Sequence, residues 1–206
     1  MTAMIRHSLQ DISAMRSRYR AQLINAMSGI KGVHLVGSRS AAGTENLAVF
    51  NSVMHVGADP AAMAVLFRPL TVQRDTYDNI KETGSFTLNL FTVDMVDAAH
   101  QTSAKYPSET SEFAATGLTP EYSDLCIAPY VKESPIRIGL SFAEEHTLDI
   151  NGTVLVVGRV DELWLPEHAM QEDGWIALDD YGIVSVAGLD TYYQGKMLAR
   201  KPYAQP

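Results

Sequence analysis

The chain has 206 residues, of which 46% are hydrophobic and 19% are charged, and its formal net charge at pH 7 is -8. A chain of this length buries roughly 70% of the surface that it exposes when unfolded, so one large core is expected. The negative charge disfavours a general affinity for nucleic acids or anionic membranes.

Targeting signals and cysteine content indicate where the protein resides. No apolar run approaches the ~20 residues of a membrane span, and the segment from Met1 to Arg20 lacks the apolar centre of a secretory signal. Cys126 is the only cysteine, which excludes an internal disulfide and suits a reducing compartment. We therefore expect a cytoplasmic protein, in which Cys126 is a small buried hydrophobe rather than a nucleophile.

The first predicted element is one amphipathic helix over residues 11–27. Its apolar side chains recur every three or four residues, at Ile12, Met15, Tyr19, Leu23 and Met27. Glycines at positions 29 and 32 end the helix. Residues 1–30 are thus predicted to be a helical extension that precedes a single domain of residues 31–206.

Strands dominate the middle of the chain. Apolar, β-favouring runs predict strands over 33–36, 47–50 and 62–67. A helix is predicted over 76–82, with Asp75 or Thr76 as its N-cap and Gly84 as its C-terminal stop. An alternating strand over 86–91 and a second helix over 94–101 follow.

The second half of the chain is also predicted to be rich in strands. They cover residues 136–140, 145–150, 153–160 and 182–186, and Asn151-Gly152 is predicted to form a type I′ hairpin turn. These short strands do not alternate with helices as in a parallel sheet. The pattern therefore favours a mainly β fold in which an antiparallel sheet closes into a barrel.

Two segments of the sequence suggest one binding site. Residues 46–53 form an apolar run that amide and hydroxyl side chains interrupt, and Arg74 and Thr76 stand at the start of a helix. The strand offers backbone N–H groups and an apolar wall to a flat polar ring, while a helix start with an arginine suits a phosphate. An interior strand and an ordinary helix cap are the alternatives that the residues leave open.

Other candidate residues carry weaker signals. Arg68 before Pro69 could also reach a phosphate, although a surface position explains it equally well. Ser103, Lys105 and Tyr106 lie in a loop from which a cation could meet a phosphate or an anionic ring. The six histidines show no paired ligand spacing, so no metal site is expected. His55 and His146 could face a ring, but each also fits an ordinary strand histidine.

With these residues in view, the chain resembles the flavin reductase family, the FMN-binding split-barrel proteins that include flavoredoxin-like NAD(P)H:flavin oxidoreductases. The similarity runs in family order from about Gly32 to Tyr193. The matching segments are residues 46–53, Asp59-Pro60, Arg74-Asp75-Thr76 with Asn79-Ile80, residues 86–89, residues 103–107, Glu112-Phe113, residues 117–119 and residues 188–193.

This resemblance implies a Greek-key split β-barrel with a few flanking helices, which binds FMN near the interface of a homodimer. It carries flavin contacts onto Asn46, Leu47, Ala48, Val49, Phe50, Ser52, Val53, Arg68, Arg74, Thr76, Ser103, Lys105 and Tyr106. No catalytic residue is nominated, because hydride transfer between stacked rings needs orientation more than acid–base groups.

The implied activity is hydride transfer from NADH or NADPH to flavin, with electrons passing to free flavin, a partner enzyme or another acceptor. Two alternatives remain open: an FMN-dependent oxidoreductase with its own organic substrate, and a non-catalytic flavin carrier. A homodimer is also expected because the C-terminal stretch is more apolar than a solvated tail needs, at Leu189, Tyr192, Tyr193, Met197 and Leu198. Packing of that stretch on its own barrel is the alternative.

Overall fold

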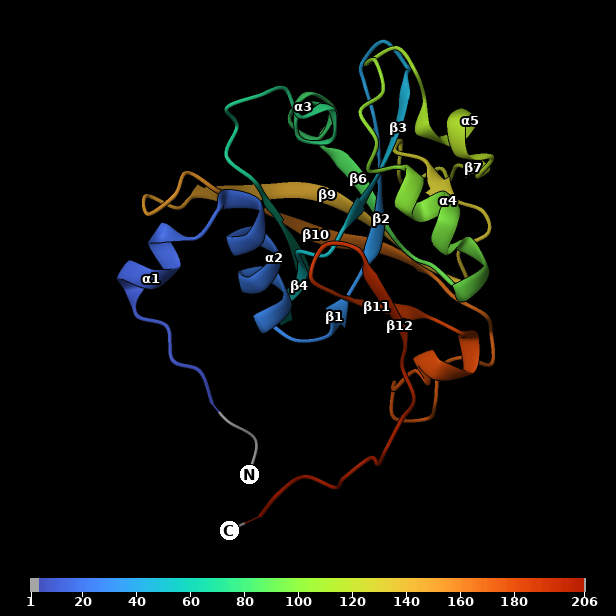
Figure 1. The fold of residues 1–206 in the computed structure, drawn as a ribbon. Coiled ribbons are helices and arrows are strands. Elements are labelled where there is room, and N and C mark those ends of the chain that lie inside the picture. Colours follow the sequence, from blue (N-terminus) through green and yellow to red (C-terminus); the bar gives the residue numbers. More distant parts are fainter. Residues whose placement is uncertain (1–3, 206) are drawn as a thin grey trace.

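Seven antiparallel strands form the central sheet of the protein, which the computed structural model describes for residues 4–205 (Figure 1). The order of the strands is β3-β2-β6-β9-β10-β5-β4. Their bounds are β2 (His34–Arg39), β3 (Glu45–Phe50), β4 (Val53–Ala58), β5 (Ala61–Phe67), β6 (Ser85–Leu90), β9 (Ile136–Thr147) and β10 (Val154–Trp164).

The connection between β3 and β4 shows that this sheet curls into a barrel. These two strands lie at opposite ends of the sheet, yet only Asn51 and Ser52 separate them in the chain. The three steps of chain from Phe50 to Val53 span at most about 11 Å, so the ends of the sheet must come close together. The amide of Leu66 on β5 donates to the Ser52 carbonyl at 3.0 Å, next to this crossing. The mainly β antiparallel barrel predicted from the sequence is confirmed.

Two apolar clusters fill the inside and cover one outer side of the barrel. The inner cluster combines fully buried side chains from β2, β5, β6, β9 and β10, including Val36, Val65, Phe86, Leu140 and Val156. The outer cluster packs the barrel against the flanking elements and includes Val33, Leu35, Leu47, Phe91 and Phe113. Full burial of each such side chain contributes about 1.5–3 kcal/mol to folding.

Short helices and two small sheets surround the barrel. The helices are α1 (Leu9–Ala14), α2 (Ser17–Met27), α3 (Asp75–Thr83), α4 (Val96–Gln101) and α5 (Glu112–Thr116), with 3-10 turns at η1 (Val93–Met95) and η2 (Leu178–Tyr181). The small sheets pair β1 (Lys31–Gly32) with β11 (Val184–Ala187) and β12 (Thr191–Gln194), and β7 (Pro120–Glu121) with β8 (Tyr130–Val131). Figure 1 shows α3 and α5 near one end of the barrel and both chain ends extending from the other.

The N-terminal region differs from the single helix predicted over residues 11–27. The helix is interrupted between α1 and α2, where Met15 adopts an extended conformation. The Arg20 guanidinium donates to the carbonyls of Ser13 at 2.9 Å and Met15 at 3.4 Å. It thereby satisfies backbone groups that the interruption leaves without helical partners.

The second half contains one long strand where two were predicted. Residues 136–140 and 145–150 were expected to be separate, but β9 continues from Ile136 to Thr147, because register shifts against β10 absorb the irregularity. The predicted type I′ turn is wrong. That turn needs positive φ at both central residues, and Gly152 has φ +72° whereas Asn151 does not have positive φ. The loop instead closes through the Gly152 amide, which donates to the Leu148 carbonyl at 2.8 Å.

Helix α3 lies close to its predicted position. It ends at Gly84, which has φ +70° and whose amide donates to the Ile80 carbonyl, as predicted. Its N-cap is Arg74, however, and not Asp75 or Thr76. Thr76 therefore belongs to the first turn of the helix, and its hydroxyl accepts a hydrogen bond from the buried Asn46 side chain.

Candidate functional site

Strand β3 forms one edge of the central sheet, so part of its backbone is free to bind other groups. Every second amide of an edge strand points away from its only neighbour. The Leu47 amide is one of these outward groups, and it donates to the carboxylate of Glu112 on α5 at 2.9 Å. The Val49 amide, two residues further, faces the same edge. One outward amide is thus used by the protein itself, and the next is a candidate donor to a ligand.

The start of α3 supplies a partly buried cation. Arg74 is the N-cap, and within residues 4–205 no side chain caps the first amides of this helix. The Nε atom of Arg74 is buried and has no hydrogen-bond partner in the same part of the chain. A buried donor without an acceptor is costly, and an anion at the helix start would satisfy it.

The two segments that the sequence predicted to share a site are in contact. The Asn46 amide on β3 donates to the Thr76 hydroxyl of α3 at 2.9 Å and to the Ser38 hydroxyl of β2 at 3.1 Å. Asn79 of α3 also donates to Ser38, at 3.2 Å. All four side chains are buried. Asn46 and Thr76 therefore fix α3 against β3, and their polar groups are largely engaged with each other.

A polar hollow of about 370 Å³ lies beside this contact. Three carboxylates line it, from Asp75, Asp78 and Glu109, and its lining contains no lysine or arginine. The Asp75 carboxylate accepts hydrogen bonds from Gln73 at 2.8 Å and Ser108 at 3.2 Å. A phosphate does not suit this hollow, so an anion at the start of α3 has to depend on Arg74.

The remaining residues of the strand segment serve the fold as well. Ala48 pairs with Val36 of β2, Val49 and Val53 are partly buried, and the Phe50 ring packs edge-on against Phe67 at 5.2 Å. The Ser52 hydroxyl donates to the Leu66 carbonyl at 2.8 Å. Ser52 thus anchors the crossing between β3 and β4.

The weaker candidates lie apart from these buried contacts. Arg68, Ser103 and Lys105 are exposed. Tyr106 is partly buried, and its hydroxyl accepts a hydrogen bond from Gln101 at 2.9 Å. The loop that carries the last three residues also contains Ser108, whose hydroxyl donates to the Asp75 carboxylate of α3.

Glu112 is a site residue that was not nominated from the sequence. The pKa of its carboxyl is raised, because burial has a larger effect than the hydrogen bond from the Leu47 amide, which lowers this pKa. The sequence marked Glu112 only as part of the Glu112-Phe113 pair before an apolar run. Its partner Leu47 lies 65 positions earlier, and no local pattern predicts that the two residues meet.

Comparisons with known proteins identify the family. Residues 27–194 match the family described as flavin reductase like domain, and the chain belongs to this family. A crystal structure of a presumed flavin reductase with a split barrel domain, from Shewanella frigidimarina NCIMB 400, has a TM-score of 0.93 and 42% sequence identity. The match covers 98% of this chain and 100% of that chain.

More distant relatives share the fold. Nitrilotriacetate monooxygenase component B from Bacillus cereus has a TM-score of 0.85 at 24% identity, over 98% of this chain and 100% of that one. Flavoredoxin of Desulfovibrio vulgaris (Miyazaki F) has a TM-score of 0.73 at 24% identity, over 95% and 97%. At these identities the likeness shows the fold alone.

Sequence relatives add no activity. An uncharacterised protein from Deinococcus radiodurans is 26% identical over an alignment that covers 97% of this chain and 92% of that protein. Another, from Aquifex aeolicus, is 30% identical over 96 residues, 46% of this chain, and this match spans about half (49%) of that protein.

Residues 4–205 contain neither a membrane-spanning helix nor a metal-binding group of side chains. No helix there is long and apolar enough to cross a membrane. In the same range, no three His, Cys, Asp or Glu side chains are grouped so that they could hold a metal ion.

Proposed function

We propose that the protein is an FMN-binding oxidoreductase that takes a hydride from NADH or NADPH and passes the electrons to an acceptor. The observation that carries this proposal is the buried, unpartnered Nε atom of Arg74 at the start of α3, beside the free edge of β3, in a chain of the flavin reductase like family. The cytoplasm, where both nicotinamide nucleotides are regenerated, is the proposed site of action.

The residues of this site fit FMN. Arg74 and the first amides of α3 would hold the phosphate, and the outward backbone of β3 around Val49 and Phe50 would hold the ring. The nearby carboxylates of Asp75 and Asp78 repel an anion, so the phosphate contact depends strongly on the guanidinium. Bound FMN would supply the hydride acceptor, which no amino-acid side chain provides.

The protein's own contribution is orientation. Asn46 holds β3 against α3 through Thr76, and Glu112 fixes the β3 backbone at Leu47. The distance between the ring-binding edge and the phosphate-binding cation is thereby set by buried hydrogen bonds. A nicotinamide ring and a flavin ring that are held in this way would react within one complex, so hydride transfer would not depend on a chance encounter in solution.

Absorbance spectroscopy of the purified protein tests the proposal. We expect a flavin spectrum, either as purified or after FMN is added and the excess removed. Anaerobic addition of NADH or NADPH should bleach it. Absence of any bound flavin contradicts the proposal.

Two alternatives predict different outcomes of the same experiment. Bound flavin that neither NADH nor NADPH reduces would indicate a carrier. Saturable oxidation of an organic compound by the bound flavin would indicate an oxidoreductase with its own substrate.

A further inference from the structure

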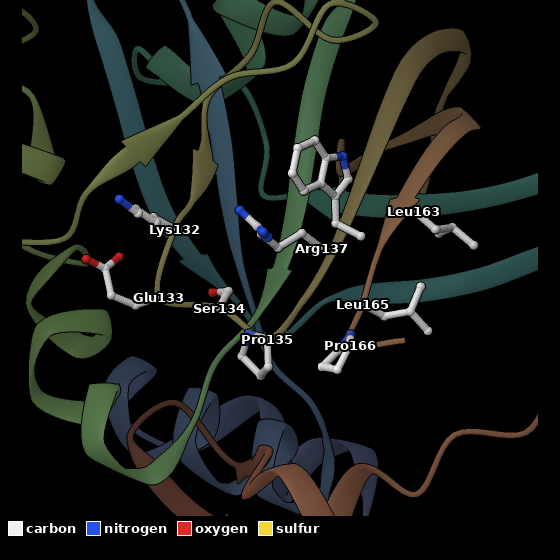
Figure 2. A pocket seen from close by; sticks show the side chains of 9 residues that line it. Lys132, Glu133, Ser134, Pro135, Arg137, Leu163, Leu165 and Pro166 are labelled. Atoms are coloured by element: carbon white, nitrogen blue, oxygen red, sulfur yellow. The ribbon is translucent and has the colours of Figure 1, made fainter. Parts of the chain in front are cut away.

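A second pocket lies on another side of the barrel, where β8 turns into β9 and β10 ends (Figure 2). Its volume is about 550 Å³, within the range of small-molecule sites. It shares no lining residue with the hollow beside β3 and α3. In the view of Figure 2 its polar side chains gather on one side, and the apolar Leu163, Leu165 and Pro166 lie on the other.

Arg137 is held rigidly in this pocket. It is the cross-strand partner of Trp164, and its guanidinium carbon lies 4.8 Å from the centre of the indole ring. An ion pair with Glu121 fixes the same group, and the side chain is only 13% exposed. Glu121 in turn is paired with Tyr130 across the β7–β8 ladder. The guanidinium is therefore positioned in advance, which reduces the conformational entropy lost when a ligand binds.

The pocket has more hydrogen-bond donors than acceptors. The Nε atom of Arg137 and the hydroxyl of Ser134 are both buried and have no hydrogen-bond partner in the described chain, and Ser134 is only 2% exposed. Lys132 adds an exposed ammonium group that makes no ion pair with any residue in the range 4–205. The one carboxylate, that of Glu133, already accepts the Thr119 amide through both oxygens at 3.1 Å.

This imbalance defines the ligand that the pocket suits. A buried donor without an acceptor costs free energy unless something binds it. An oxyanion is the acceptor that the Ser134 hydroxyl, the unpaired Nε atom of Arg137 and the ammonium group of Lys132 favour. The remaining walls are apolar, from Pro135, Leu163, Trp164, Leu165 and Pro166. The indole N–H of Trp164 is engaged with Glu162 at 2.9 Å, so this ring offers its apolar surface.

We propose that this pocket binds an organic acid, with its carboxylate at Ser134, Arg137 and Lys132 and its apolar body along Trp164 and Leu165. The proposal is independent of the flavin site, since the two sets of residues do not overlap. Benzoate is the simplest probe of this class, and benzamide is its uncharged counterpart with the same ring.

Tryptophan fluorescence reports on the pocket directly. The chain has two tryptophans, so in the Trp175→Phe protein the emission comes from Trp164 alone. We expect benzoate to change this emission saturably, and benzamide to bind at least tenfold more weakly because it carries no charge. Saturating FMN should leave the benzoate affinity unchanged.

Two variants in the same background identify the donors. Ser134→Ala should weaken benzoate by about tenfold or more, the effect of losing a hydrogen bond to a charged group. Its melting temperature should not fall, because the hydroxyl has no partner in the free protein. Lys132→Ala should weaken benzoate by a few-fold, as expected for an exposed cation. Lys201→Ala, which removes an exposed lysine in the C-terminal segment, is the matched control and should bind like the parent.

Three results would each overturn the proposal. One is a response to benzoate that does not saturate or that equals the response to benzamide. The second is unchanged benzoate affinity in both Ser134→Ala and Lys132→Ala. The third is competition between benzoate and FMN, which would place the acid in the flavin site instead.

Discussion

Arg74 brings a guanidinium group to the start of α3, with its Nε atom buried and unpaired among residues 4–205. Arg68, the other arginine predicted to reach a phosphate, is exposed. A buried donor atom loses more from the absence of an anion than an exposed donor does, because water cannot replace the missing acceptor. The two arginines should therefore contribute unequally to phosphate binding.

Replacement of Arg74 tests this difference. A charge-assisted hydrogen bond contributes roughly 1.5–3 kcal/mol, so Arg74→Ala should weaken FMN by about ten- to a hundredfold. Riboflavin, which lacks the phosphate, should bind almost as before, and Arg68→Ala should have the smaller effect on FMN. Titration calorimetry with both flavins measures these affinities. Equal losses for FMN and riboflavin would exclude Arg74 from the phosphate site.

His34 makes the stability of the protein depend on pH. Burial lowers its pKa from 6.5 to about 4, and its Nδ1 atom has no partner in the described structure. The unfolded chain binds the proton more readily, so stability is complete above pH ~6.5 and falls as the pH drops towards ~4, by about 3 kcal/mol in total.

Urea unfolding at two pH values checks this expectation. Between pH 7 and pH 5 the free energy of unfolding of the parent should fall by about 2 kcal/mol, and this decrease should be absent in the His34→Leu protein. His55→Ala, which removes an exposed histidine, should behave like the parent. The same pH dependence in His34→Leu and the parent would show that His34 is not the titrating group.

The exposed histidines are not expected to take part in hydride transfer. His146 on β9 is 57% exposed and lies 3.5 Å from Glu144, and His55 is exposed on β4. Reduction of the flavin should therefore change little between pH ~6 and ~8, where a catalytic histidine would titrate. Stopped-flow reduction with NADH deuterated at C4 measures the step. Loss of reduction in His146→Ala, with FMN fully bound, would give His146 a catalytic role.

Helix α5 and strand β3 are joined by the contact between Glu112 and the Leu47 amide. In Glu112→Ala this buried amide loses its acceptor, which costs about 1–3 kcal/mol of stability. Glu112→Gln keeps an oxygen at the same place and should be affected less. Hydrogen exchange of the Leu47 amide reads this contact directly. It should be slow in the parent and in Glu112→Gln and fast in Glu112→Ala, and retained protection in Glu112→Ala would contradict the assignment.

The whole molecule exposes more apolar surface than its barrel requires. Helices α1 and α2 contain no buried residue, and Met27 is 74% exposed. The edge strand β4 exposes Met54 and Val56. One residue of the C-terminal stretch predicted to contact a second subunit packs on its own chain instead. The Tyr192 ring packs on Phe91, and its hydroxyl lies 3.0 Å from His100 Nδ1. Leu198, by contrast, is fully exposed.

We therefore expect a homodimer that covers these surfaces. An obligate interface of this kind commonly buries more than ~2,000 Å². Light scattering at micromolar concentration should give twice the chain mass of 22.6 kDa. A monomeric mass with flavin still bound would contradict the dimer.

The sequence alone determined the features that depend on neighbouring residues. The alternation in β6, the Gly84 stop of α3 and the abundance of short strands were enough to predict a mainly β barrel, because they reflect local backbone preferences and periodic burial. The two segments of the candidate site were also recognisable, since each carries its own chemistry.

Only the tertiary structure decided which polar groups remain free. Asn46 meets Thr76 across 30 positions, and Glu112 meets Leu47 across 65. These contacts leave Arg74, rather than Thr76, as the donor without a partner. The break between α1 and α2 and the continuity of β9 likewise depend on Arg20 and on the register with β10. Such pairings follow from how the sheet closes, and no local pattern in the chain encodes them.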